Sequence, residues 1–266
     1  MKRRRRPHRK RLDRKKSIFV LPNLITTGSL FLGFYAAISS IQAHFPQAAL
    51  AVVGSMFLDG LDGRIARLTK TTSRFGTEYD SLADLIAFGL APALMIYLWA
   101  LEPFGRMGWL AAFLFVTCGA LRLARFNVQV DTVPGDHFNG LPIPAAAAML
   151  AATVLFFDHL NLGSHVFHVP IMVMIYGLSF LMVSTVKFVS FKNMDYFRRK
   201  SFNSLVVGVL LFVVIAANPF VMGFVVMLCY VLSGPIMCIR HLRGKKASDD
   251  SDERSSTETA AAEAGE

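Results

Sequence analysis

Charged residues are scarce in this chain of 266 residues: they make up 17% of it, against about a quarter of an ordinary soluble domain. Cysteine is scarcer still. Cys118, Cys229 and Cys238 each lie in an apolar stretch, so neither a disulfide framework nor a zinc site is predicted. Apolar residues reach 54%, and the mean hydropathy is +0.47. These proportions exclude a plain soluble enzyme, a disordered chain and a disulfide-stapled secreted domain, and they indicate a multi-pass membrane protein.

A membrane-spanning helix needs about 20 mostly apolar residues. The sequence offers eight such stretches, at 19–41, 47–67, 80–100, 107–126, 142–159, 166–187, 203–217 and 219–239. We therefore predict an all-α fold, a polytopic transmembrane helix bundle of about eight spans. The first span is expected to begin at Pro22, which suits a helix start, and Pro219 is expected to separate the two short last spans.

Basic residues lie almost entirely on one side of this arrangement. Eleven of the 28 Lys and Arg fall between Lys2 and Lys16, and with eight spans only Arg106 falls on the opposite side. The positive-inside rule then predicts two cytoplasmic termini in the inner cell membrane. The expected organisation is a basic tail at 1–18, a membrane domain at 19–240 and a disordered tail at 241–266. The basic tail is interpreted as a topology signal that touches anionic lipid, not as a nucleic-acid site.

Four carboxylates fall near the cytoplasmic ends of the second and third spans, where each needs a compensating partner. Asp59 and Asp62 are three residues apart, and Asp80 and Asp84 are four apart, so each pair shares a helix face. A short loop joins the two spans, which predicts a hairpin with both pairs at one depth. Such a cluster suits hard divalent cations, Mg²⁺ or Mn²⁺, and has room for two ions.

Small residues and one guanidinium accompany these acids. Gly60, Gly63, Ala66 and Gly76 leave space for a ligand to approach the backbone, and Arg67 offers a fork suited to a phosphate. The set is typical of a site for a substrate that carries a pyrophosphate. Intramembrane carboxylates also occur in proton relays and in transporters of protons or divalent cations. Transporters, however, place such acids nearer the middle of the membrane, on broken helices.

The complete pattern is Asp59, two residues, Asp62-Gly63, two residues, Ala66-Arg67, eight residues, Gly76, three residues, Asp80, three residues, Asp84. It resembles the signature of the CDP-alcohol phosphatidyltransferase family at every defined position. The resemblance implies a homodimer in which Asp59, Asp62 and Asp80 bind metal and Asp84 is the general base and a further ligand. It also implies CDP-diacylglycerol contacts from the residues Asn23, Thr26, Gly63, Arg67 and Ser73.

Three further stretches, at 121–127, 138–144 and 190–192, resemble sequences of the family branch that uses L-serine as acceptor. The predicted count of eight spans also suits that branch. The resemblance implies transfer of the phosphatidyl group from CDP-diacylglycerol to L-serine, with release of CMP. Arg122 and Arg125 share a helix face, where they would hold a carboxylate or a lipid phosphate, and Asn127 would orient the serine ammonium. Interfacial anchoring is the alternative role for the two arginines, and a role at the helix end is the alternative for Asn127.

Two alternatives for the function stay open at this point. The same chemistry would serve glycerol 3-phosphate, inositol phosphate or an archaeal-type lipid. A carboxylate-based ion transporter is the alternative from another class.

Overall fold

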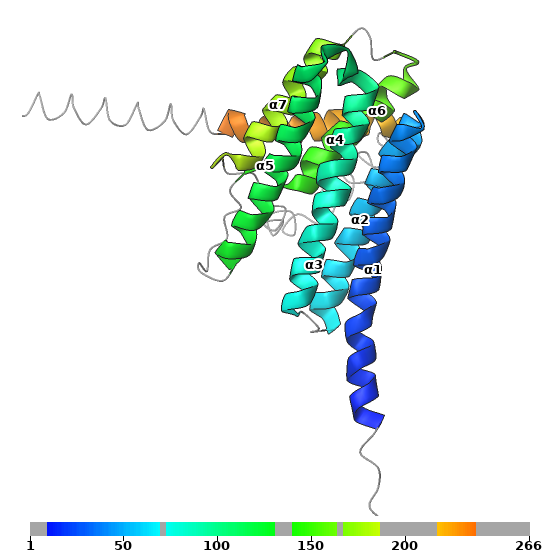
Figure 1. The fold of residues 1–266 in the computed structure, drawn as a ribbon, viewed down its shortest axis with the longest axis vertical. Coiled ribbons are helices and arrows are strands. Elements are labelled where there is room, and N and C mark those ends of the chain that lie inside the picture. Colours follow the sequence, from blue (N-terminus) through cyan, green and yellow to red (C-terminus); the bar gives the residue numbers. More distant parts are fainter. Residues whose placement is uncertain (1–9, 70–72, 131–139, 164–166, 187–216, 238–266) are drawn as a thin grey trace, which may run out of the picture.

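The computed structural model describes residues 10–69, 73–130, 140–163, 167–186 and 217–237. Within these ranges the chain is helical and contains no strand, as the all-α prediction requires. The predicted span at 203–217 lies outside the described residues except for its last position. So do the tail residues 1–9 and 241–266. The described helices form a bundle that is elongated along α1 (Figure 1).

Helices α1, Lys10–Ile41, and α2, Phe45–Thr69, form an antiparallel pair joined by a turn at which Ala43 adopts φ 60°. A polar clasp joins their middles: the hydroxyls of Ser29 and Ser55 lie 2.7 Å apart, and the Ser55 hydroxyl donates to the Ser29 carbonyl at 3.0 Å. Buried hydroxyls in an apolar environment need such partners, and the small side chains let the two helices approach closely.

Pro22 begins the first apolar span, Pro22–Ile41, as the sequence predicted, but the helix itself does not start there. The helix already begins at Lys10, so part of the expected basic tail is helical and Pro22 lies inside it. A proline removes one backbone hydrogen bond and crowds the preceding turn, at a cost of about 3 kcal/mol in a helix interior. One missing backbone hydrogen bond does not end this helix, because the helix continues without a break from Pro22 to Ile41.

The third predicted span is one continuous helical stretch, Arg74–Phe104, with changes of helical pitch. It consists of α3 (Arg74–Asp84), the π-helical η1 (Leu85–Leu90), α4 (Ala91–Ile96), the π-helical η2 (Tyr97–Leu101) and a short 3₁₀ turn, η3 (Glu102–Phe104). Such widened turns occur often at functional sites. Here η1 follows directly after Asp84, where α1 packs against it through Gly33.

The next three helices are α5 (Arg106–Val130), α6 (Ile143–His159) and α7 (His168–Val183). Gly140 precedes α6 with φ +86°, and its amide donates to the Val186 carbonyl at 2.9 Å. A Cβ at this position would lie 2.5 Å from the Met182 carbonyl oxygen, so the turn that leads into α6 requires glycine. Phe138 and Asn139, from the same serine-branch stretch, lie outside the described residues.

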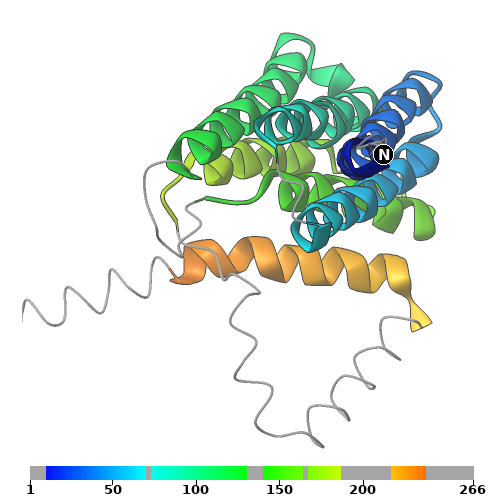
Figure 2. The same cartoon turned by 90° about the horizontal axis from the view of Figure 1, so that it is seen from below.

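A final helix covers Pro219–Met237 and packs against α6, where the Phe224 ring stacks on Phe156 with centroids 4.5 Å apart. It runs across the long axes of α1 and α2 instead of along them (Figures 1 and 2).

Among the described residues, four helical segments are long and apolar enough to cross a membrane: Pro22–Ile41, Arg74–Phe104, Arg106–Val128 and Pro219–Met237. Helix α2 is of similar length but carries the charged signature residues. The chain is thus a helical membrane protein, while eight spans and cytoplasmic termini stay predictions.

Replacing Gly33 with Ala is expected to separate α1 from the π-helical turn η1. The added Cβ would lie 2.6 Å from the Cα of Ala87, which is backbone and cannot rotate away. We expect a loss of about 1–3 kcal/mol, measured as a lower midpoint of thermal unfolding in detergent. The matched control is Gly177→Ala on α7, where nothing lies within 4 Å of an added Cβ. Equal midpoints for the two variants would contradict this account of the α1–η1 contact.

Candidate active site

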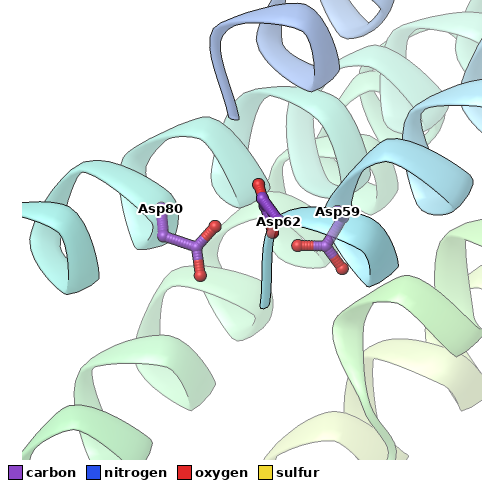
Figure 3. A group of neighbouring side chains, drawn as sticks. All are labelled: Asp59, Asp62 and Asp80. Atoms are coloured by element: carbon purple, nitrogen blue, oxygen red, sulfur yellow. The ribbon is translucent and has the colours of Figure 1, made fainter. Parts of the chain in front are cut away.

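Three carboxylates from two helices converge near one end of the bundle. Asp59 and Asp62 project from α2 and Asp80 projects from α3, and one oxygen of each lies within 4.8 Å of the others. Figure 3 shows the Asp80 side chain pointing toward the other two. Asp62 is the most enclosed, with 4% of its surface exposed. The prediction that the two helices bring these acids together is therefore confirmed for Asp59, Asp62 and Asp80.

Two successive threonines on helix α1 contact the helices that carry this cluster. The Thr26 hydroxyl donates to an Asp62 carboxylate oxygen at 2.7 Å, and it is itself 5% exposed. The Thr27 hydroxyl lies 2.9 Å from the Tyr79 hydroxyl, one residue before Asp80. Each threonine therefore fixes one of the two helices that carry the acids. The Tyr79 contact was not found from the sequence, because no local pattern separates Tyr79 from other interfacial aromatics.

Asp84 lies beside the three-carboxylate group and is hydrogen-bonded to Asp59. The structure therefore places Asp84 next to Asp59, with the positive charge of Arg122 on α5 within electrostatic reach.

The donor set fits a divalent metal. Three carboxylates within 4.8 Å of one another repel strongly in a low-dielectric environment unless a cation or protons neutralise them. Carboxylate oxygens are the ligands that Mg²⁺ and Mn²⁺ prefer. The cluster is thus placed to bind a metal ion through Asp59, Asp62 and Asp80.

A family model described as CDP-alcohol phosphatidyltransferase matches residues 19–183, which include the whole acid cluster. The chain belongs to the CDP-alcohol phosphatidyltransferase family. Membership confirms the resemblance drawn from the eight signature positions. It identifies the protein as a transferase and favours this function over the alternative hypothesis of a carboxylate-based ion transporter.

This CDP-alcohol phosphatidyltransferase is similar to several curated proteins whose names give an acceptor. The chain is 43% identical over 179 residues to a CDP-diacylglycerol–serine O-phosphatidyltransferase of Helicobacter pylori, covering 67% of this chain and 76% of that one. A Bacillus subtilis protein of the same name is 38% identical over 175 residues, covering 65% and 92%. An archaetidylserine synthase of Methanothermobacter thermautotrophicus is 35% identical over 181 residues, covering 66% and 72%.

The residues expected to contact CDP-diacylglycerol lie around the start of α3 and the end of α2. Ser73 is the N-cap of α3, where its hydroxyl accepts from the Gly76 amide at 3.0 Å. The Asn23 side chain lies at the same turn, because a Cβ on Gly76 would be 3.4 Å from the Asn23 Oδ1. Gly63 has open space beside it, with nothing within 4 Å of an added Cβ. The Arg67 side chain lies outside the described part of the structure.

The three residues expected on the acceptor side of the transferase differ in their partners. Arg125 donates to the Val183 carbonyl at the end of α7 at 3.0 Å, and the Asn127 amide donates to the Ser81 hydroxyl at 3.0 Å. The buried Nε of Arg122 has no hydrogen-bond partner in the described part of the chain. Of these three residues, Arg122 is therefore the one whose Nε could donate a hydrogen bond to a substrate near Asp84.

Thr26→Val is expected to weaken metal binding. The variant removes the hydrogen bond that orients Asp62 but keeps the side chain's volume. Loss of such an outer contact typically costs about ten- to a hundredfold in metal affinity. Titration of the purified protein with Mn²⁺, followed by electron paramagnetic resonance, measures this change. Thr26→Ser keeps the hydroxyl and is expected to bind as the unaltered protein does. Equal affinity for both variants would show that the hydrogen bond does not organise the site.

Proposed function

We propose that the protein transfers the phosphatidyl group from CDP-diacylglycerol to L-serine, forming phosphatidylserine and CMP. The observation that carries the proposal is the cluster of Asp59, Asp62 and Asp80 beside Asp84, built from the complete family signature. Relatives that carry a serine transferase name, at 38% and 43% identity, support serine as the acceptor. The alternatives with the same chemistry are glycerol 3-phosphate and inositol phosphate.

The site would hold Mg²⁺ or Mn²⁺, and we propose two ions, with Asp84 as a fourth ligand. When bound, such ions neutralise the pyrophosphate and stabilise the CMP that leaves. The chain's own residues supply the other parts of the reaction. Asn23, Thr26, Gly63, Arg67 and Ser73 are proposed to line the CDP side. Of these, Gly63 lets the backbone approach the phosphates, and Arg67 offers its fork to them.

Asp84 is proposed as the general base. It accepts the proton of the serine hydroxyl, and the oxygen attacks the phosphorus that bears the diacylglycerol group. The new phosphorus–oxygen bond forms as the bond to the CMP oxygen breaks, and that oxygen keeps the electron pair. Asp84 would begin this step without a proton. Direct displacement of this kind needs no covalent intermediate with the protein.

Arg122 is proposed to bind the serine carboxylate. Its guanidinium lies within electrostatic reach of Asp84, so a carboxylate held there would bring the serine hydroxyl close to the base. Arg125 and Asn127 stay candidates for the serine or for a lipid phosphate. To take part, each would have to exchange its hydrogen bond to Val183 or Ser81 for one to the substrate.

We further propose that the enzyme lies in the inner cell membrane with this site facing the cytoplasm, where serine is dissolved, and that two copies form a homodimer. The asymmetric distribution of basic residues supports the orientation. The membrane domain at 19–240 would keep the diacyl chains in the bilayer during transfer, with tails at 1–18 and 241–266.

An acceptor panel tests the proposed function. Purified protein in detergent receives CDP-diacylglycerol, Mg²⁺ or Mn²⁺, and one acceptor at a time, with CMP release as the readout. We expect release with L-serine and none with glycerol 3-phosphate or inositol phosphate. Asp59→Asn is expected to abolish release without lowering the midpoint of thermal unfolding. Asp158→Asn, at an exposed carboxylate near the end of α6, is the matched control and should be fully active.

The outcomes of this panel separate the alternatives. Release with another acceptor only would keep the acid site and overturn serine as the substrate. Activity of Asp59→Asn equal to that of the unaltered enzyme would overturn the assignment of the acid cluster itself.

Arg122→Gln and Arg125→Gln are expected to have different effects. Losing a hydrogen bond to a charged group costs about 1.5–3 kcal/mol, so Arg122→Gln should raise the KM for serine roughly ten- to a hundredfold. The KM for CDP-diacylglycerol should change little. Arg125→Gln instead frees the Val183 carbonyl and should lower the midpoint of thermal unfolding. If the two variants raise the KM for serine equally, the distinction drawn between these arginines is wrong.

A further inference from the structure

Two polar side chains join α3 to α5 one helical turn from the proposed base. The Asn127 amide nitrogen on α5 donates to the Ser81 hydroxyl on α3 at 3.0 Å, and the Asn127 Oδ1 lies 3.4 Å from the same hydroxyl. Ser81 precedes Asp84 by three residues, so the two share a face of α3 and lie about 4.5 Å apart along its axis. The contact therefore lies close to the groups that are proposed to receive the acceptor.

The hydrogen bonds of Ser81 decide which way the Asn127 carboxamide faces. The Ser81 hydroxyl has one proton, and it lies 3.1 Å from the Thr77 carbonyl oxygen, one turn back on its own helix. This carbonyl is closer than the Asn127 Oδ1 and takes the proton. The hydroxyl then accepts from Asn127 and does not donate to it. The amide nitrogen is therefore held at Ser81, and Oδ1 keeps its lone pairs for another donor.

The pairing of α5 with the stretch Arg74–Phe104 sets the level of this oxygen along the bundle. Gly108, near the start of α5, lies against the Leu101 carbonyl, whereas Asn127, near the end of α5, lies against Ser81. The two stretches are thus antiparallel. In this pairing the proposed base falls between the level of Asn127 and the level of Arg122 on α5.

We propose that Ser81 is a positioning residue that holds the Asn127 carboxamide so that its Oδ1 accepts a hydrogen bond from the acceptor's ammonium group. This inference rests on the proposed function and adds a third contact to serine. With its carboxylate at Arg122 and its hydroxyl at the base, serine turns its ammonium toward Asn127. An ammonium has three donors and suits a carboxamide oxygen, whereas a lipid phosphate offers only acceptors.

Binding of the ammonium needs little rearrangement of this pair. Oδ1 exchanges its longer contact with Ser81 for one to the substrate, and the 3.0 Å bond from the amide nitrogen stays in place. Holding the carboxamide in advance lowers the entropy cost of binding, because one rotamer of Asn127 is already selected.

The test compares serine with 3-hydroxypropanoate, which is serine without its ammonium group, in the full-length enzyme. Ser81→Ala leaves the carboxamide free to turn, and we expect the KM for serine to rise about two- to tenfold. The inhibition constant of 3-hydroxypropanoate, measured as a competitor of serine, should stay within about twofold. So should the KM for CDP-diacylglycerol. A purely structural role for Ser81 would weaken the binding of both acceptors alike.

Ser40→Ala is the matched control. It also removes a buried serine hydroxyl that donates to the carbonyl one turn back on its own helix, in this case that of Ala36 at 2.7 Å. Ser40 lies about 20 Å along α1 from Thr26 and hence from the acid cluster. This control should leave all three constants unchanged.

A double variant shows whether Ser81 acts through Asn127. Asn127→Ala should raise the KM for serine about ten- to a hundredfold, again without weakening 3-hydroxypropanoate. In that background Ser81→Ala should have no further effect, because the group that it orients is gone. An unchanged KM for serine in Ser81→Ala, an equal loss for both acceptors, or full additivity in the double variant would overturn the inference. An unaltered enzyme that releases CMP only with a different acceptor would instead overturn the proposed function, so the two failures are distinguishable.

Discussion

The mutual repulsion of four carboxylates at the edge of an apolar bundle is the constraint on which the rest of the structure depends. In water such a cluster would cost little, but near a membrane interior the energy of each pair rises several-fold. Two neighbouring groups reduce that cost. Thr26 donates to Asp62, and Arg122 contributes a positive charge nearby. The oxygen donors that remain are the ones a divalent cation would satisfy.

Close packing of small residues places these groups. Gly33 lets α1 contact the π-helical turn at Ala87, directly after Asp84, and the Ser29–Ser55 clasp holds α1 against α2. Helix α1 thereby fixes both acid-bearing helices, although its own contribution to the acid cluster is the threonine pair. A buried cluster of charged groups cannot be supported by flexible side chains, because their movement would change the distances between the acids. Glycine, serine and alanine allow contact between backbones, which is stiffer.

The sequence predicted the acid cluster well, because its spacing on two helices is a local property. Helical periodicity places Asp59 with Asp62, and a short loop brings Asp80 to the same depth. Local spacing could not predict that Pro22 lies inside a helix, because proline occurs both at helix starts and at helix interruptions. Only the backbone hydrogen bonds that continue on both sides of it decide between these two positions. The π-helical turns of 85–90 and 97–101 depend on packing against α1 and α5 and have no residue pattern of their own. Arg122 and Arg125 look equivalent in the sequence, yet their partners come from other helices, so only the fold separates them.

The arrangement of helices around the acids also bears on the chemistry. Displacement at phosphorus requires the attacking and leaving oxygens to lie on opposite sides of the reacting atom. The proposed nucleotide contacts Asn23 and Ser73 come from α1 and from the start of α3, whereas Arg122 comes from α5. The two substrates would thus be held by different helices near the carboxylates. A change of acceptor would then require changes on α5 while the signature on α2 and α3 stays intact. This separation is a physical reason why one signature serves transferases with different acceptors.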